Sequence, residues 1–296
     1  MRWNRVENAE DVIDARGAGG SGGGRMSGLP GGMALPTGGV GLVAVLVLLG
    51  IQLLGGGTSF DVPTALDDQA AQVEPDPLPA TNDPDAKLKD FTVAVFTDVQ
   101  SMWREVFTGS SLGYDRAKLV LYRRGVNSGC GAASSAVGPF YCPADKRVYL
   151  DLSFQSDMRS QLGADGDFAW AYVIAHEMGH HAQQELGTDD RVRDLARQSP
   201  DQANALSVRQ ELQADCYAGV WAQRAYRAGA LEEGDIDEAL NAAAAVGDDR
   251  LQSRGGGGVN PDSFTHGTSE QRSRWFKKGY ESGDADACDT FAAEDI

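Results

Sequence analysis

One short run of residues, His176-Glu177-Met178-Gly179-His180, constrains this chain more than any other part of its sequence. Residues four apart in a helix lie on one face, with Cβ atoms about 5–6 Å apart. Two histidines at that spacing can both reach one zinc ion at about 2.0–2.1 Å. Glu177 lies one step round the helix, where it is poorly placed to bind the metal and well placed to act on a metal-bound water. The run therefore predicts a helix that carries a zinc site and a general base.

The residues around this run also favour a helix. Phe168, Tyr172 and Ala175 recur at helical spacing, and Gly187 is a helix-stop signal. The competing interpretation is an amphipathic core helix with two surface histidines. A pair of acidic residues further along the chain argues against it. The chain contains four histidines, which are His176, His180, His181 and His266.

A catalytic zinc ion usually takes three protein ligands and leaves one position for water, so a third ligand is needed. His181 is poorly placed because it is turned about 100° round the helix from its neighbour, whereas His266 stays possible. Glu211 is the stronger candidate, because Asp215 follows four residues later on the same helical face. Asp215 can then accept a hydrogen bond from the second nitrogen of a ligand histidine and fix its orientation.

The alternative for Glu211 and Asp215 is a solvent-exposed helix face, where such carboxylate pairs are common. Apolar neighbours argue for a buried helix, and these are Leu212, Ala214, Ala218 and Val220. A buried pair of carboxylates needs a counter-charge such as a metal ion. We therefore expect Glu211 to bind zinc and Asp215 to orient a ligand.

The chain has 296 residues and a net charge of −17. This acidic balance argues against nucleic acid as a partner, because a phosphate backbone attracts a basic surface. It argues equally against a polybasic patch on a membrane surface. Residues 86–296 are enough for one domain of about 200 residues with a single buried core.

Three segments precede that domain. Residues 1–37 are a short polar head followed by a glycine-rich run, a composition that cannot bury a core, so we expect disorder. Residues 38–57 contain no charged residue and match the roughly 20 residues that a helix needs to cross a bilayer. A retained transmembrane helix is favoured over a cleaved signal peptide, because the head before it is long. Residues 58–85, rich in proline and aspartate, are expected to form an extended linker.

Basic residues predict the orientation of this anchor. Arginines precede the apolar stretch, and the first basic residue after it is Lys87. The positive-inside rule then places the N-terminus in the cytoplasm and the domain on the other side of the membrane. We thus expect a single-pass membrane protein with an extracytoplasmic domain.

Periodicity predicts an α+β domain that is mainly helical with a small sheet. Helices are expected at 87–107, 201–228 and about 235–247. Thr268 and Gln271 form a capping box, which predicts the start of a last helix.

Strands are expected at 118–122 and 147–154, whereas 125–146 is loop-like. The second strand comes just before the motif helix. Its backbone edge can border the cleft and pair with an extended substrate, or it is an ordinary strand without such a role. The residues alone leave both alternatives open.

Four cysteines in a domain placed outside the cytoplasm predict two disulfides. Of three possible pairings we favour Cys130 with Cys142, which closes a short loop. The second pair is then Cys216 with Cys288, which joins the C-terminal tail to the helix of Glu211. No Cys-x-x-Cys spacing occurs, so a cysteine-rich metal site is not expected.

Four runs carry a resemblance to a known family, and they are residues 128–143, 173–183, 211–221 and 262–276, joined by Met1-Arg2-Trp3. They resemble the neutral zinc metallopeptidase family over most of residues 88–292. The resemblance implies a zincin-like fold, Zn2+ as the cofactor and a peptide or protein as the substrate. It also implies three zinc ligands, His176, His180 and Glu211, with Glu177 as the catalytic acid/base.

The leading hypothesis is therefore a membrane-anchored, zinc-dependent peptidase. Glu177 would take a proton from the attacking water and pass it to the leaving amine. The developing oxyanion needs a further donor. His266 is the first candidate for that catalytic role, and Tyr149 and Tyr217 are alternatives.

Two other functions compete with this hypothesis. One is a non-catalytic, metal-stabilised extracytoplasmic binding or assembly domain. The intact Glu177 argues against it, because a structural metal site needs no base. The other is a zinc hydrolase of a non-peptide amide, such as a cell-wall crosslink, which the sequence does not separate from a peptidase.

Overall fold

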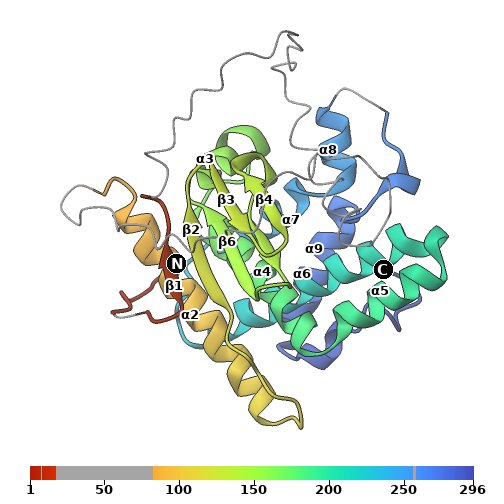
Figure 1. The fold of residues 1–296 in the computed structure, drawn as a ribbon, viewed down its shortest axis with the longest axis horizontal. Helices are drawn as coiled ribbons and strands as arrows, with labels where there is room; N and C mark the ends of the chain where they lie inside the picture. The colour runs from red at the N-terminus through yellow and green to blue at the C-terminus, as the bar shows by residue number, and fades with distance from the viewer. Residues whose placement is uncertain (8, 18–82, 256–257) are drawn as a thin grey trace, which may run out of the picture.

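The computed structural model describes residues 1–7, 9–17, 83–255 and 258–296 (Figure 1). The predicted transmembrane helix at 38–57 and nearly all of the predicted linker lie outside these residues. In the part of the chain that is described, no helix is both long and apolar enough to cross a membrane.

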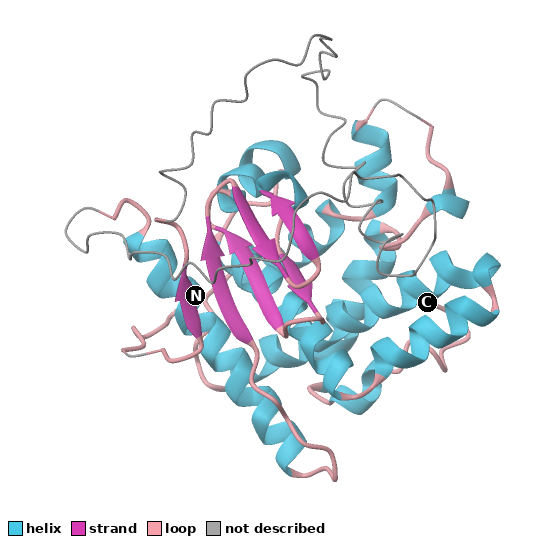
Figure 2. Cartoon of the chain, viewed as in Figure 1, coloured by secondary structure: helices cyan, strands magenta, loops and turns pink. Residues whose placement is uncertain are grey.

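A four-stranded sheet has the strand order β1-β2-β6-β5 (Figure 2). Its strands are β1 (Val12–Asp14), β2 (Lys118–Tyr122), β5 (Phe140–Cys142) and β6 (Arg147–Asp151). β1, β2 and β6 run parallel, and β5 lies antiparallel to β6 at one edge. A hairpin of β3 (Gly125–Ser128) and β4 (Gly131–Ser134) forms a second small sheet. The strand predicted at 118–122 is confirmed as β2. The strand predicted at 147–154 is confirmed as β6 up to Asp151, but Phe154 begins helix α3. The region predicted as loop holds β3, β4 and β5.

Helices form most of the remaining domain. They are α2 (Ala86–Thr108), α3 (Phe154–Asp157), α4 (Asp167–Glu185), α5 (Thr188–Gln198), α6 (Ala203–Arg227), α7 (Asp235–Ala245), α8 (Asp248–Arg254) and α9 (Ser269–Ser282). Short turns of 3-10 or π helix occupy Ser135–Val137, Met158–Leu162, Pro200–Gln202, Pro261–Ser263 and Ala285–Cys288. The predicted helices are confirmed as α2, α6, α7 and α9, and the predicted capping box opens α9.

The main core lies between one face of the sheet and the helices behind it (Figure 2). Leu119 of β2 and Val148 of β6 face this core and are fully buried. Helix α4 runs through its middle. Between residues 168 and 183 of α4, every residue is buried except Val173 and His180, so these two side chains mark where α4 meets a cleft.

The expectation that residues 1–37 are disordered is wrong for the described part of that head. Val12–Asp14 forms β1, which pairs in parallel with residues 119–121 of β2. The ring of Trp3 packs against Phe91 of α2, with 5.6 Å between ring centroids. A short β-branched strand lies just before the glycine-rich run, so the composition of residues 1–37 as a whole did not reveal that this strand can complete a sheet edge.

A buried ion pair joins this head to the start of the domain. The guanidinium Nη2 of Arg16 lies 2.7 Å from Asp14 Oδ2 and 2.6 Å from Asp83 Oδ2. Together with β1, this contact holds the head against the domain. The single-pass arrangement predicted from sequence puts them on opposite sides, so it requires β1 to leave the sheet.

Paired cysteines test whether β1 is in the sheet. Ile13 and Val120 lie opposite each other in β1 and β2, and Cα atoms about 4.4–6.8 Å apart are within disulfide reach. In the variant Ile13→Cys/Val120→Cys we expect a crosslink in intact cells, detected as a linked peptide by non-reducing mass mapping. The two single variants serve as controls. Labelling of Cys at position 13 from the side opposite to the domain, with no crosslink, would show that β1 is unpaired.

Candidate metal centre

Three side chains from two helices converge on one point beside the cleft. His176 and His180 lie on α4, and Glu211 lies on α6. His176 Nε2 is 3.2 Å from Glu211 Oε2, and His180 Nε2 is 3.5 Å from Glu211 Oε1. One atom from each residue falls within 4.8 Å of the others. Two imidazole nitrogens and one carboxylate oxygen are the donor set of a catalytic zinc ion.

Hydrogen bonds orient both imidazoles toward that point. His176 Nδ1 lies 2.9 Å from Asp215 Oδ1, and His180 Nδ1 lies 2.9 Å from Gln183 Oε1. An acceptor at Nδ1 holds the proton there and leaves the Nε2 lone pair free for a metal. The residues present therefore fit zinc. Asp215 was predicted from the sequence to have this orienting role, and Gln183 was not.

Asp215 is the centre of a fully buried polar network. Arg272 of α9 donates to it twice, from Nε to Oδ2 at 2.8 Å and from Nη2 to Oδ1 at 3.0 Å. The hydroxyl of Tyr172 donates to the same carboxylate. Burial raises the pKa of Asp215, but the positive charge of Arg272 and the hydrogen bonds from His176 and Arg272 outweigh burial and lower that pKa. The carboxylate is thus kept ionised inside the protein.

Arg272 was not predicted from the sequence, although the sequence carries a signal for it. Arg272 shares one face of α9 with Trp275, Phe276 and Gly279, and all four are buried. A charged residue on such an apolar face needs an opposite charge nearby. Asp215, which was also predicted to be buried, needs an opposite charge as well. The sequence therefore suggests that Arg272 and Asp215 pair.

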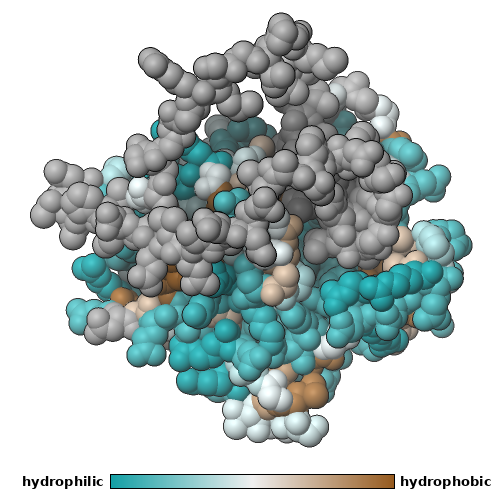
Figure 3. Space-filling view, viewed as in Figure 1, coloured by the Kyte–Doolittle hydropathy of each residue, from teal (hydrophilic) through white to brown (hydrophobic). Residues whose placement is uncertain are grey.

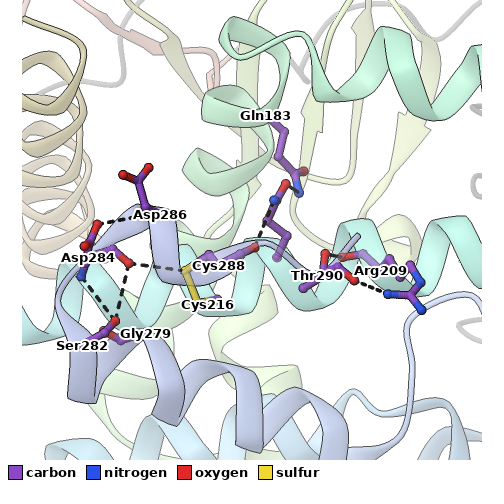
Figure 4. The surroundings of a disulfide bond; sticks show 10 residues. Gln183, Arg209, Cys216, Gly279, Ser282, Asp284, Asp286, Cys288 and Thr290 are labelled. Carbon is purple, nitrogen blue, oxygen red and sulfur yellow. Dashed lines mark hydrogen bonds between the residues drawn. A yellow bond between two sulfur atoms is a disulfide. The ribbon is translucent and has the colours of Figure 1, made fainter. Parts of the chain in front are cut away.

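Both predicted disulfides are present. Cys130 pairs with Cys142, and Cys216 pairs with Cys288. The second bond joins Cys216, the residue of α6 that follows Asp215, to the C-terminal tail (Figure 4). Gln183 also faces this region, because it donates to Gln213 at 3.1 Å, and Gln213 donates to the carbonyl of Cys288 at 3.1 Å.

Glu177 is buried between the metal-binding point and the edge strand β5. Burial raises the pKa of its carboxyl group, while His180 and His176 lower it, and the net shift is upward. The backbone N–H of Tyr141 on β5 also lowers the pKa of this carboxyl group. Glu177 lines the cleft together with both histidines.

Strand β5 borders the cleft, whereas β6 does not. The sequence left open whether residues 147–154 border the cleft, and the structure favours an ordinary strand, because β6 has β2 on one side and β5 on the other. The lining of the cleft, whose volume is about 240 Å3, includes residues 137–141 at β5. The order of strands in a sheet is not encoded in their periodicity, so the sequence could not identify the edge.

His266 faces the cleft without joining the metal-binding group. Its Nδ1 lies 3.3 Å from Asp248 Oδ1 and 2.9 Å from Thr265 Oγ1. Asp248 also accepts the backbone N–H groups of residues 265–267 at Oδ2. Burial lowers the pKa of His266, but Asp248 and Glu211 outweigh burial and raise it.

The remaining sequence candidates lie away from the cleft lining. Tyr149 donates to Asp145 at 2.6 Å, and Tyr217 packs edge-on against Trp103. Neither tyrosine lines the cleft, so the expectation that one of them could replace His266 is wrong for this structure. His181 is buried and contacts the Tyr141 hydroxyl and the Asp115 carbonyl, which gives it a structural role.

The orienting role of Asp215 is testable through metal affinity. In Asp215→Asn we expect zinc to bind roughly 10–100-fold more weakly, because changes to a residue that orients a ligand usually cost that much. The measurement is competition with a chromophoric chelator on folded protein. Asp286→Asn, at an exposed position on the tail, is the matched control. Equal zinc affinity in the two variants would contradict the role.

Comparison with known proteins also indicates that this chain binds zinc. The family model described as "Putative neutral zinc metallopeptidase" matches residues 1–291. The chain is 46% identical over 292 residues to the uncharacterized protein YpfJ of Escherichia coli (strain K12), covering 98% of this chain and 99% of that protein. It is 45% identical over 215 residues to the uncharacterized protein Rv2575 of Mycobacterium tuberculosis, covering 69% of this chain and 71% of that protein.

No solved structure matches the chain. The family model spans nearly the whole sequence, including the β1 segment and all residues of the metal centre. The family implies a Zn2+ cofactor, in agreement with the donor set described above. The chain therefore belongs to the neutral zinc metallopeptidase family.

Proposed function

We propose that this protein is a zinc-dependent peptidase that hydrolyses peptide bonds. The observation that carries the proposal is the position of Glu177, buried beside the His-His-Glu group and exposed to the cleft. A structural metal site needs no base at this position and is usually closed on all sides. The arrangement thus favours catalysis over the non-catalytic binding or assembly domain.

Glu177 is proposed as the general base and then the general acid. Zinc in a site of this kind supplies Lewis-acid chemistry, which polarises a carbonyl group and makes a water acidic near neutral pH. Glu177 accepts a proton from the attacking water and returns it to the leaving amine nitrogen. Burial suits it to both tasks, because a raised pKa makes the protonated form accessible.

The open edge of β5 supports a peptide as the substrate. Among the described strands, β5 pairs only with β6 and so has one unpaired edge. An extended peptide can pair with such an edge through its own backbone. Tyr141 in β5 is adjacent to Glu177, so the paired peptide would pass beside the base. A non-peptide amide would not make this backbone pairing.

His266 is proposed to stabilise the developing oxyanion. Its Nδ1 is held by Asp248, and Asp248 and Glu211 raise the pKa of the imidazole, which favours the imidazolium form. A positioned positive donor of this kind lowers the energy of an oxyanion in a site shielded from water.

We also propose a cellular compartment for this protein, on the basis of its disulfides. Two disulfides among the described residues favour an oxidising compartment outside the cytoplasm. Attachment through residues 38–57 stays a prediction. A single crossing with a cytoplasmic N-terminus and the pairing of β1 exclude each other, so the crosslink at position 13 also decides this point.

Glu177→Gln tests the base directly. We expect the variant to keep its zinc and to lose hydrolysis by roughly 10²–10⁴-fold, the usual contribution of a general acid–base group. Zinc is measured by elemental analysis and cleavage by mass analysis of a diverse peptide pool, with and without a chelator. Glu105→Gln, an exposed position on α2, is the matched control. Undiminished cleavage by the Glu177 variant would remove the assigned role.

The pH dependence of the rate tests His266. The pKa of His266 is raised above 6.5 and the pKa of Glu177 above 4.5. The rate should therefore rise with pH as Glu177 loses its proton and fall as His266 loses its own. In His266→Gln we expect a lower kcat and no fall at alkaline pH. If the variant kept the alkaline limb, another group would have to cause it.

A further inference from the structure

The cleft differs in chemistry between its two ends, and the difference follows the axis of α4. Val173 lies about one helical turn before His176, and it lines the cleft on the N-terminal side of the metal centre. Asp189, on α5 just after α4, lines the cleft beyond His180. The metal-binding group lies between these ends.

Apolar side chains from separate segments meet at the N-terminal end. We call them the apolar chamber, which consists of Val137, Phe154, Leu162, Val173, Val246 and Leu251. Hydrogen bonds between its segments fix its walls. Arg254 of α8 donates to the carbonyl of Leu162 at 2.9 Å, and Asn241 of α7 donates to the carbonyl of Gly163 at 2.8 Å. The chamber is thus enclosed by α4, the turn around Leu162 and the junction of α7 with α8.

The other end of the cleft is mainly polar, although Val192 of α5 also lines it. Asp189 and Arg193 of α5 and Ser207 and Gln210 of α6 line it, and Gln210 donates to Asp189 at 2.6 Å. The surface over α5 is hydrophilic (Figure 3). A large apolar side chain of a bound peptide would therefore leave water at the chamber end and meet polar groups at the other.

This asymmetry gives the proposed peptidase a substrate class. Resting on the proposed function, we propose that the enzyme selects peptides with a large apolar side chain at one of the two residues that flank the cleaved bond. The apolar chamber receives that side chain. Each methylene group moved from water into an apolar site changes the binding constant roughly fourfold. Leucine has three more carbon atoms than alanine, so it should be favoured by roughly 60-fold.

The test uses the full-length, zinc-loaded protein and two independent readouts. The first is kcat/KM for matched peptides that carry leucine or alanine at the position identified from a cleaved pool. The second needs no turnover. Immobilised Glu177→Gln protein is exposed to the same pool, and the bound peptides are sequenced. We expect large apolar residues to be enriched at the same position in both readouts.

Two variants change the chamber in opposite directions. Val246→Phe fills it, and the preference for leucine over alanine should fall toward one. Leu251→Ala enlarges it, and the preference should move from leucine toward phenylalanine. Val259→Phe, at a position that is 45% exposed and outside the cleft lining, is the matched control. Zinc content and circular dichroism of each variant establish that it is folded.

The outcomes separate this inference from the proposed function. Cleavage without an apolar preference at either flanking position overturns the inference and leaves a peptidase. Apolar enrichment in the bound pool without any cleavage overturns the peptidase and supports the chamber. An apolar preference that neither Val246→Phe nor Leu251→Ala alters overturns the chamber as its origin.

Discussion

The buried carboxylate of Asp215 is the interaction on which the rest of the site depends. It lies on α6 and contacts His176 of α4 and Arg272 of α9. Removal of one partner from a buried ion pair costs about 3–5 kcal/mol, so the charge on either side is difficult to replace. The three helices must therefore meet where this carboxylate is satisfied. The same meeting brings Glu211, one turn earlier on α6, beside the imidazoles.

Close helix crossings make this meeting possible. A Cβ atom at Gly279 of α9 would lie 1.9 Å from the carbonyl oxygen of Cys216, and one at Gly219 would lie 2.0 Å from that of Phe276. These distances are too short for any side chain, so only glycine lets α6 and α9 approach this closely. Cys216 directly follows Asp215, and Arg272 lies two turns before Gly279. The crossing thus sets the distance of the buried ion pair.

The parts of the site that depend on spacing within one helix could be predicted from the sequence. The two motif histidines and the pair Glu211 and Asp215 each lie four residues apart, so helical geometry alone brings them to one face. Contacts between elements carry no such local spacing. Arg272 and the edge strand β5 depend on which helix or strand is the neighbour. β1 was hidden because its few apolar residues precede a long glycine-rich run.

The phase of α4 links the chemistry to the choice of substrate. Val173, His176 and His180 recur at i, i+3 and i+7, which is one stripe of a helix. A rotation of α4 that removed the imidazoles from the cleft would also withdraw Val173 from the apolar chamber. Glu177, one step round, lines the cleft on the side of β5. The motif that most constrains the chain therefore also determines where a neighbouring side chain of the peptide would lie.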